Sequence, residues 1–204
     1  MKFRAVFAAL VLALAVTMPI ASQAAEAAQG PMALVSRLND TLIEVMRNAK
    51  DLGYRGRYER LAPVLKQTFN FPVMAGISSG SHWRGFSAEQ KANLSDAFGR
   101  MSIGTFANRF DGFGGERFEV TGEEPGPRGT VLVRNKLIKS DGDAIEINYL
   151  TKDYSGEWRV VDVYLDSKFS ELAVKRSEYT SVLDKEGLDG LIARIETKLA
   201  EWGG

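Results

Sequence analysis

The amino-acid sequence predicts an α+β fold in which an antiparallel, four-stranded sheet packs against helices. Apolar residues recur at helical spacing towards both ends of the chain, and the spacing changes to every second residue in the middle. Turns of the Asp-Gly and Ser-Gly type join the alternating segments, as in hairpins. We therefore expect helices over residues 31–110, the sheet over 116–166 and helices over 170–202, in a single domain of residues 25–204.

The N-terminal half is predicted to be helical. Leucine, valine and methionine residues at helical spacing indicate a helix over residues 31–52, and Gly53 is expected to end it. A second helix is predicted over residues 60–68. Ser87 and Gln90 form a capping-box pattern, which indicates that a further long helix starts there.

The middle of the chain is predicted to form a meander of strands, followed by two helices. The four strands are expected at residues 118–120, 130–138, 144–154 and 157–165. Asp141-Gly142 and Ser155-Gly156 are typical of the turns of β-hairpins. Helical spacing then returns over residues 170–183, Gly187 interrupts it, and the last helix follows.

The first residues have the order of a cleavable secretory signal. Lys2 and Arg4 precede an apolar run over residues 5–16, and Ser22-Gln23-Ala24 places small residues where a signal peptidase reads. The run is shorter than the roughly 20 residues that a membrane-spanning helix needs. We expect residues 1–24 to be removed and the mature protein to work as a soluble protein outside the cytoplasm.

The composition excludes several classes of site. Without cysteine, the chain has no disulfide, no acylated cleavage site and no thiolate metal ligand. The 26 basic and 26 acidic residues balance, and loss of the predicted signal peptide leaves a net charge of −2, which argues against nucleic-acid binding. His82 is the only histidine and no Gly-x-Ser-x-Gly motif occurs, so we expect no metal site, no catalytic triad and no cofactor.

Two further features have competing interpretations. The glycine-rich stretch 112–115 follows a helix and precedes a strand, the reverse of a phosphate-binding loop, so we predict a turn. Asp162 is in phase with Trp158, Val160 and Tyr164 and would point at the same apolar face, where a raised pKa suits a general base. The alternative is a carboxylate on the outer face or one hydrogen-bonded to a neighbouring strand. We favour this alternative because no second catalytic group is evident.

Both faces of the last predicted strand are apolar. Alternation assigns its residues to two faces: Trp158, Val160 and Tyr164 on one, and Val161, Val163 and Leu165 on the other. A sheet open to water on one face would show polar alternation instead. Two apolar faces indicate either helices on both sides of the sheet or a ligand on one side, and the residues alone leave both possibilities open.

Motifs in a fixed order resemble the MlaC or toluene-tolerance family. In the N-terminal half they are Phe71, Gly80, Trp83-Arg84, Ser87-Ala88-Glu89-Gln90, Phe98 and Thr105-Phe106-Ala107. In the C-terminal half they are Ile147-Asn148-Tyr149, Trp158–Val163, Arg176-Ser177-Glu178-Tyr179 and Gly187–Ile192. The resemblance covers nearly the whole mature chain.

One stretch departs from the family pattern. Family members commonly have Gly-Val-Ser after the Asp-Val strand, where this chain has Asp166-Ser167-Lys168-Phe169-Ser170. Together with residues 171–179, this stretch resembles the hopanoid-biosynthesis-associated branch, HpnM. The resemblance therefore implies either a phospholipid or a hopanoid as the ligand.

The resemblance implies a fold and a function. The fold is an NTF2-like sheet packed against helices around a lipid-sized pocket. The function is that of a periplasmic lipid carrier between the inner and outer membranes, which works with an inner-membrane ABC-type transport complex and an outer-membrane acceptor and contacts membranes transiently.

A lipid carrier needs apolar surface to enclose acyl chains, and the last predicted strand, residues 157–165, offers such surface. Each exposed methylene costs about 0.8 kcal/mol, so a diacyl lipid with roughly 28 of them faces on the order of 20 kcal/mol in water. A carrier must enclose the chains and needs no catalytic motif to do so. We expect the pocket to be lined by Phe98, Met101, Phe106, Ile147, Tyr149, Val161, Val163, Leu165 and Tyr179.

Two other functions compete with the carrier. One is an NTF2-like enzyme on an apolar substrate, with Asp162 as its acid or base. The other is a periplasmic assembly factor whose apolar surface binds a membrane complex. We favour the carrier, which is not an enzyme.

Overall fold

The computed structural model describes residues 30–166 and 169–203. The predicted signal peptide, residues 1–24, lies outside the described residues. The helices are α2 (Pro31–Arg47), α3 (Ala49–Thr68), α4 (Phe71–Ser78), α5 (Ala88–Arg109) and α6 (Glu171–Gly203), with the 3₁₀ turns η1 (Gly80–Gly85) and η2 (Pro127–Gly129). The strands are β1 (Arg117–Pro125), β2 (Thr130–Ile138), β3 (Ala144–Tyr154), β4 (Glu157–Leu165) and β5 (Phe169–Ser170).

The strands form one antiparallel sheet in chain order, with β1 at one edge and β5 at the other. The α+β class and the antiparallel meander are therefore confirmed, whereas the predicted number of four strands is wrong. The fifth strand has two residues, in which Ser170 pairs with Tyr164 and Phe169 pairs with Leu165. A run this short shows no alternation, so the sequence pattern predicted the start of a helix there.

The first strand is longer than predicted. β1 continues beyond Val120 to Pro125, because a β-bulge between Val120 and Gly122 inserts one residue and breaks the alternation. The predicted hairpin turn at Ser155-Gly156 is confirmed. Both residues have positive φ, 58° and 92°, as a type I′ turn requires.

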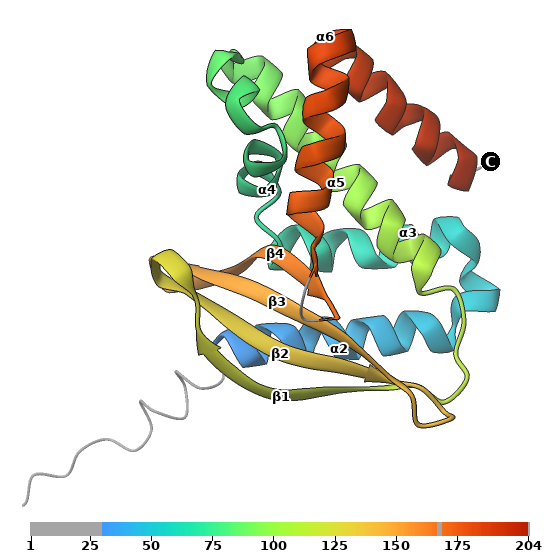
Figure 1. The fold of residues 1–204 in the computed structure, drawn as a ribbon. Coiled ribbons are helices and arrows are strands. Elements are labelled where there is room, and N and C mark those ends of the chain that lie inside the picture. Colours follow the sequence, from blue (N-terminus) through green and yellow to red (C-terminus); the bar gives the residue numbers. More distant parts are fainter. Residues whose placement is uncertain (1–29, 167–168, 204) are drawn as a thin grey trace, which may run out of the picture.

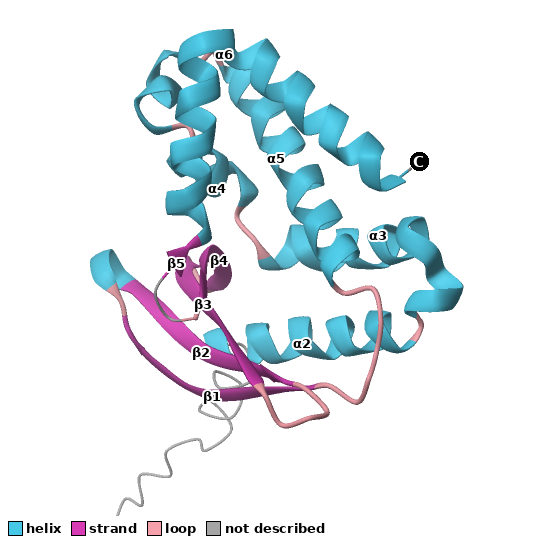
Figure 2. Ribbon diagram, turned by 45° about the vertical axis from the view of Figure 1, so that its right-hand side comes forward, coloured by secondary structure: helices cyan, strands magenta, loops and turns pink. Residues whose placement is uncertain are grey.

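The helices form two groups around the sheet (Figure 1). α2 packs along one face of the sheet, called the inner face below, where it contacts β1, β2 and β4 (Figure 2). Its fully buried stripe includes Leu38, Leu42 and Val45. The helices α4, α5 and α6 stand together beyond the β4 side of the sheet, and α5 is central because it contacts α3, α4 and α6.

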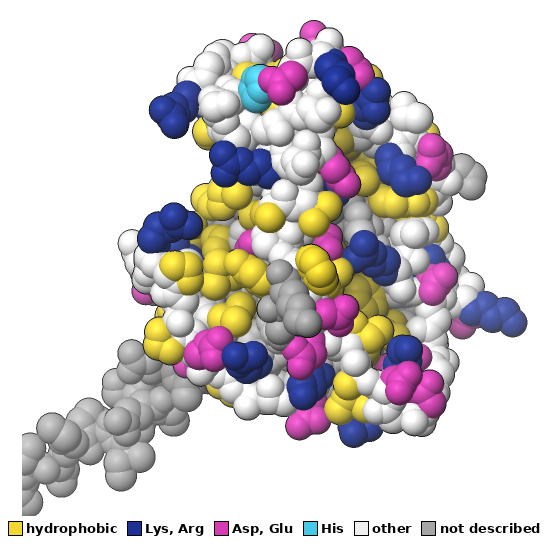
Figure 3. Space-filling view, in the orientation of Figure 1, with side chains coloured by type: hydrophobic (Ala, Val, Ile, Leu, Met, Phe, Trp, Pro, Cys, Tyr) yellow, Lys and Arg dark blue, Asp and Glu magenta, His cyan; other side chains and the backbone are white. Residues whose placement is uncertain are grey.

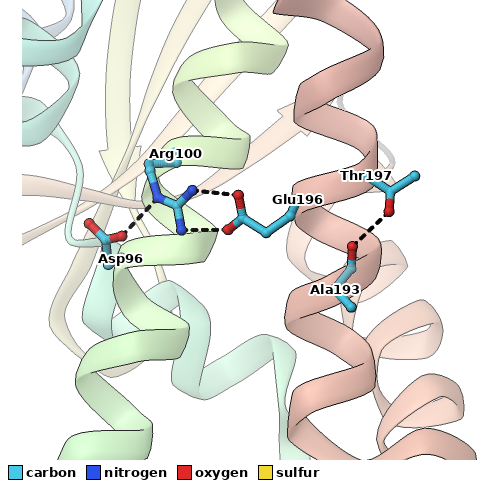
Figure 4. A network of polar contacts seen from close by, with 5 residues as sticks. All are labelled: Asp96, Arg100, Ala193, Glu196 and Thr197. Carbon is cyan, nitrogen blue, oxygen red and sulfur yellow. Dashed lines mark hydrogen bonds and ion pairs between the residues drawn. The ribbon is translucent and has the colours of Figure 1, made fainter.

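The start of α5 and its contact with α6 are both fixed by polar groups. The predicted capping box is confirmed: Ser87 Oγ accepts from the backbone N–H of Gln90 at 3.1 Å, and Gln90 Oε1 accepts from the Ser87 N–H at 2.9 Å. Further along, Arg100 donates to both oxygens of Glu196 on α6, at 2.8 and 2.5 Å, and to Asp96 (Figure 4). The hydrogen bonds to Glu196 raise the pKa of Arg100. Because both partners are more than one-third exposed, the pair contributes at most about 1 kcal/mol.

Two glycines break helical runs at the positions that the sequence indicates. Gly53 (φ 59°, ψ −175°) lies within α3, and Gly187 (φ 69°, ψ −169°) divides α6 into two segments. The predicted boundaries around Gly53 are wrong in two respects. The first helix already ends at Arg47, with Asn48 outside the helical region at φ −102°, and helical hydrogen bonding resumes directly after Gly53 instead of near residue 60.

Replacing Gly187 with alanine is expected to destabilise the protein by about 1–3 kcal/mol, because its backbone conformation is accessible essentially to glycine alone. No atom lies within 4 Å of the position that a Cβ would take at Gly187, so the cost is conformational and not steric. Urea unfolding followed by circular dichroism measures it. Gly85→Ala is the matched control, since that site is also open but lacks a positive φ. Equal stability of the two variants would contradict the prediction.

Candidate functional site

An apolar cavity lies between the inner face of the sheet and the helices α4, α5 and α6. Its volume is about 120 Å³. The apolar and aromatic residues of its wall are Phe69, Met74, Phe98, Phe106, Phe110, Ile147, Tyr149, Val163, Leu165 and Leu172. The polar lining residues are Ser102, Thr105, Arg109, Glu171 and Lys175.

Aromatic rings in mutual contact form much of the wall. Phe69, directly after α3, meets the ring of Phe106 edge-on with centroids 5.6 Å apart and that of Tyr149 at 6.3 Å. Phe106 in turn stacks on Phe110 at 5.6 Å. The chain at Phe69 is attached to the sheet by a bridge to Val160, and the N–H of the next residue donates to the Val160 carbonyl at 2.9 Å. The rings therefore form a wall anchored on both the sheet and the helices.

Six of the nine residues predicted to line a pocket lie in this wall: Phe98, Phe106, Ile147, Tyr149, Val163 and Leu165. The other three lie elsewhere. Met101 is half-buried against the core, and Tyr179 is buried beside Phe98, with ring centroids 6.2 Å apart. Val161 lies on the opposite side of the sheet, so its placement in the pocket is corrected.

A β-bulge in β4 is the reason for this correction. Leu150 of β3 pairs with Asp162, and the next residue of β3, Thr151, pairs with Val160, which leaves Val161 as an extra residue in β4. An extra residue shifts the alternation of side chains between the two faces by one position.

The two faces of β4 therefore differ from the prediction. Trp158 and Val160 pack against the core on the same side as Val163 and Leu165. The outer face carries Val161, Asp162 and Tyr164, which line a groove of about 340 Å³ with α4 and the start of α6. The strand has two apolar faces because the cavity lies on one and helices partly cover the other.

Asp162 fixes the start of α6. Its Oδ1 accepts from the backbone N–H groups of Val163 at 2.8 Å and Leu172 at 3.2 Å, and its Oδ2 accepts from Ser170 Oγ at 2.6 Å. The Ser170 hydroxyl also accepts from the N–H of Ala173 at 2.9 Å, so two side chains cap the helix. Burial raises the pKa of Asp162, and these hydrogen bonds offset the rise in part. Ser170 lies on β5, the neighbouring strand, so the structural hydrogen bond that we favoured for Asp162 is confirmed. The carboxylate faces away from the cavity.

Tyr149 brings one polar atom into the apolar wall. Its side chain is fully buried, and its hydroxyl has no hydrogen-bond partner among the described residues. Burial raises the pKa of Tyr149, so the phenol is neutral at physiological pH. A buried hydroxyl without a partner costs free energy.

The sequence analysis missed several lining residues that a helical pattern contains. Ser102, Thr105 and Arg109 were missed, and each lies three or four residues from another lining residue of α5, as do the predicted Phe98 and Phe106. That spacing could have identified the polar members as well as the apolar ones. Phe69 had no such signal, because it follows a helix and reaches the cavity only through its bridge to β4.

The remaining candidates take part in structure. His82 Nε2 lies 2.9 Å from Asp184 Oδ1 and so joins η1 to α6. The glycine-rich stretch 112–115 connects α5 to β1, as predicted. Within residues 30–166 and 169–203, no group of three or more His, Cys, Asp or Glu residues is placed to hold a metal ion. No helix in the described part of the chain is long and apolar enough to cross a membrane.

A family model described as MlaC protein matches residues 36–197, more than half of the chain. The chain belongs to the MlaC family. A curated relative, the intermembrane phospholipid transport system binding protein MlaC of Haemophilus influenzae, is 25% identical over 126 residues, which are 60% of this chain and 58% of the relative. The alignment thus spans less than two thirds of that relative's length.

A solved structure has the same fold as this MlaC family member. It is the phospholipid-binding protein of Ralstonia solanacearum in complex with a phospholipid, with a TM-score of 0.73 and 17% sequence identity. The match covers 85% of this chain and 98% of the other. At this identity the likeness shows the α+β fold.

Substitutions at Asp162 separate the hydrogen bonds of its carboxyl group from its charge. Because burial raises the pKa of Asp162, the folded state binds the proton more tightly than the unfolded chain does, and stability falls as the group ionises with rising pH. Asp162→Asn keeps the acceptor and is expected to be at least as stable as the wild type at neutral pH, with the difference lost below roughly pH 4. Asp162→Ala removes the acceptor of two N–H groups and should cost about 1–3 kcal/mol.

Thermal unfolding at neutral and acidic pH measures both variants. An asparagine variant clearly less stable than the wild type at neutral pH would show that the charge itself is needed. Lipid uptake should be unchanged in the asparagine variant, because it keeps the acceptor for the Leu172 N–H and the group lies outside the cavity.

Tyr149→Phe removes the hydroxyl that lacks a partner and keeps the ring. We expect the free energy of unfolding to rise by about 1 kcal/mol, because a buried polar group is lost and no contact is broken. Urea unfolding of the lipid-free protein measures the change. A loss of stability would mean that the hydroxyl has a partner, such as a bound water.

Proposed function

We propose that this MlaC family member carries a phospholipid through the periplasm, between the inner and outer membranes, after export by its signal peptide. The apolar cavity between the sheet and the α4–α6 layer is the observation that carries the proposal. The phospholipid is suggested by the name of the Haemophilus relative and by the phospholipid in the Ralstonia structure. The partners that we propose are an inner-membrane ABC-type complex and an outer-membrane acceptor.

The wall of the cavity suits acyl chains. Ten of its lining residues are apolar or aromatic, and enclosing chains needs surface of this kind without directional bonds. We propose that Phe98, Phe106, Ile147, Tyr149, Val163 and Leu165 contact the lipid. Tyr179 packs against Phe98 of this wall, and Met101 packs against the core.

The volume of the cavity sets a requirement on loading. It is about 120 Å³, below the roughly 300–1,000 Å³ of pockets for drug-sized ligands. A diacyl lipid is larger than such ligands, so its entry requires the helical layer to separate from the sheet. Contacts that involve the backbone hold the helices to β4, among them the Phe69–Val160 bridge and the cap that Asp162 provides for α6.

Exposed apolar residues lie at the start of α6, close to the cavity. Phe169 is 62% exposed and Val174 is 47% exposed, and both are near Leu172, which lines the cavity. Figure 3 shows hydrophobic side chains gathered on this side of the molecule, with Lys and Arg side chains around them. Apolar residues flanked by cations suit the interface of an anionic membrane, and we propose that the transient membrane contact occurs here.

A hopanoid is the second candidate ligand. The stretch from Asp166 to Ser170 and the residues after it resemble the hopanoid-associated branch HpnM, and this branch assignment stays a prediction. The proposed carrier is not an enzyme. The location of Asp162 outside the cavity removes the acid or base that the enzyme alternative required.

The proposal is tested by native mass spectrometry of the protein purified from its own periplasm, followed by lipid extraction. We expect a stoichiometric adduct, and the mass of the extracted lipid distinguishes a phospholipid from a hopanoid. A protein that is purified empty and takes up no lipid from vesicles would contradict the carrier and favour the assembly factor.

Two substitutions in one strand show which face holds the lipid. Val163→Phe adds a ring to the cavity and should abolish most lipid uptake from phospholipid vesicles. Val161→Phe makes the same change two residues away, in the outer groove, and should retain uptake. Circular dichroism establishes that both variants fold, and equal loss of uptake in both folded variants would place the lipid elsewhere.

A further inference from the structure

The polar residues that line the cavity come from two facing helices. Ser102, Thr105 and Arg109 recur at intervals of three and four along α5, and Glu171 and Lys175 are four apart at the start of α6. Residues with this spacing share one side of a helix. Because α5 and α6 contact each other, the two rows form one polar edge of an otherwise apolar cavity. We call Arg109, Glu171 and Lys175 the charged rim.

The charged residues of the rim form fewer and longer ion pairs than several other charged residues of the surface do. Elsewhere, Arg60, Arg134 and Arg194 lie 2.6 to 2.9 Å from carboxylate oxygens. Within residues 30–166 and 169–203, neither Arg109 nor Glu171 forms an ion pair within 4.0 Å, and the nearest carboxylate to Lys175 is Glu178, at 3.8 Å. The charged rim therefore retains much of its capacity to bind a ligand.

Lys175 is partly withdrawn from solvent. Its side chain is only 24% exposed, and its ammonium group lies 5.7 Å from the centroid of the Tyr179 ring. Tyr179 is itself buried against Phe98, which lines the cavity. The cation is therefore held beside the apolar wall and cannot be regarded as an ordinary surface lysine.

Helix dipoles offer a purely structural explanation for two of the three charges. Arg109 lies in the last turn of α5 and Glu171 in the first turn of α6, where these signs of charge are favourable. Lys175 is not explained in this way, because it lies one turn after the N-terminus of α6, where the dipole gives a cation no benefit.

We propose that Arg109 and Lys175 bind the phosphate of a lipid headgroup at the charged rim, while the cavity encloses the acyl chains. This inference rests on the proposed carrier function. A guanidinium group donates two parallel hydrogen bonds to phosphate oxygens, and an ammonium group acts as a point charge beside it. Glu171 and Glu178 are the carboxylates beside these two cations, and Glu178 lies 3.8 Å from the Lys175 ammonium group. Through the two cations, the rim selects a phosphate-bearing lipid over an uncharged lipid with the same chains.

A competition experiment tests this selection. Delipidated protein is incubated with equal amounts of dioleoyl phosphatidylglycerol and dioleoylglycerol in an uncharged detergent, and the bound lipids are extracted and quantified. The wild type should bind phosphatidylglycerol with roughly tenfold preference, the effect of one charge-assisted contact. The Arg109→Gln/Lys175→Gln variant should bind the two lipids about equally, with its total occupancy retained. Added salt should reduce the wild-type preference, because the rim is partly exposed.

The matched control is Arg117→Gln/Lys66→Gln, which removes the same two charge types from exposed positions outside the cavity lining. It should keep the wild-type preference. If the wild type shows no preference, or if the rim variant keeps it, the headgroup site is wrong and the carrier function stands. If the wild type takes up neither lipid, the carrier function fails, and the inference fails with it.

Discussion

The hydrogen bonds of Asp162 are the constraint on which the cavity depends. The bulge at Val161 turns this carboxylate to the outer face of the sheet, where it holds the N–H of Leu172 and the hydroxyl of Ser170. The first turn of α6 is thereby fixed to β4. The same strand presents Val163 on its other face as part of the cavity wall. One irregularity in one strand thus determines both what lines the cavity and where the helix beside it begins.

The two sides of the cavity differ in how they are held. The sheet is joined by backbone hydrogen bonds between its long strands. Side-chain contacts hold the helices to one another and to the sheet. The ion pair between Arg100 and Glu196 joins α5 to α6. The aromatic contacts of Phe69 reach Phe106 on α5 and Tyr149 on β3. Side-chain contacts between layers can separate and re-form without breaking either layer's backbone structure. The fold is therefore suited to a cavity whose size changes, provided that the anchored start of α6 keeps its place.

The sequence predicted the fold class, the meander, the capping box at Ser87 and the break at Gly187, because each of these depends on local spacing or on a single residue type. It did not predict β5 or the true faces of β4. A two-residue strand has no periodicity, and a bulge is invisible to a rule that assumes strict alternation. Most of the predicted lining residues lie together because the spacing of apolar residues in the sequence assigned them to the correct face of their helix or strand. Val161 was assigned to the wrong face because the bulge shifts the alternation in β4. Phe69 was missed because only the tertiary bridge to Val160 brings it to the cavity.

If the proposed carrier function holds, the small volume of the cavity has a consequence for release of the lipid as well as for its entry. Where the walls of a binding site touch, a ligand must first part them, and the free energy lost in parting them offsets some of what enclosing the ligand releases. A carrier built in this way holds its lipid less tightly than a rigid, open container with the same apolar area would. When the lipid leaves, the walls meet again and regain their contacts, which favours release. A cavity whose walls meet when it is empty thus lowers affinity and favours release, and the proposed transfer of a lipid between two membranes requires release as much as binding.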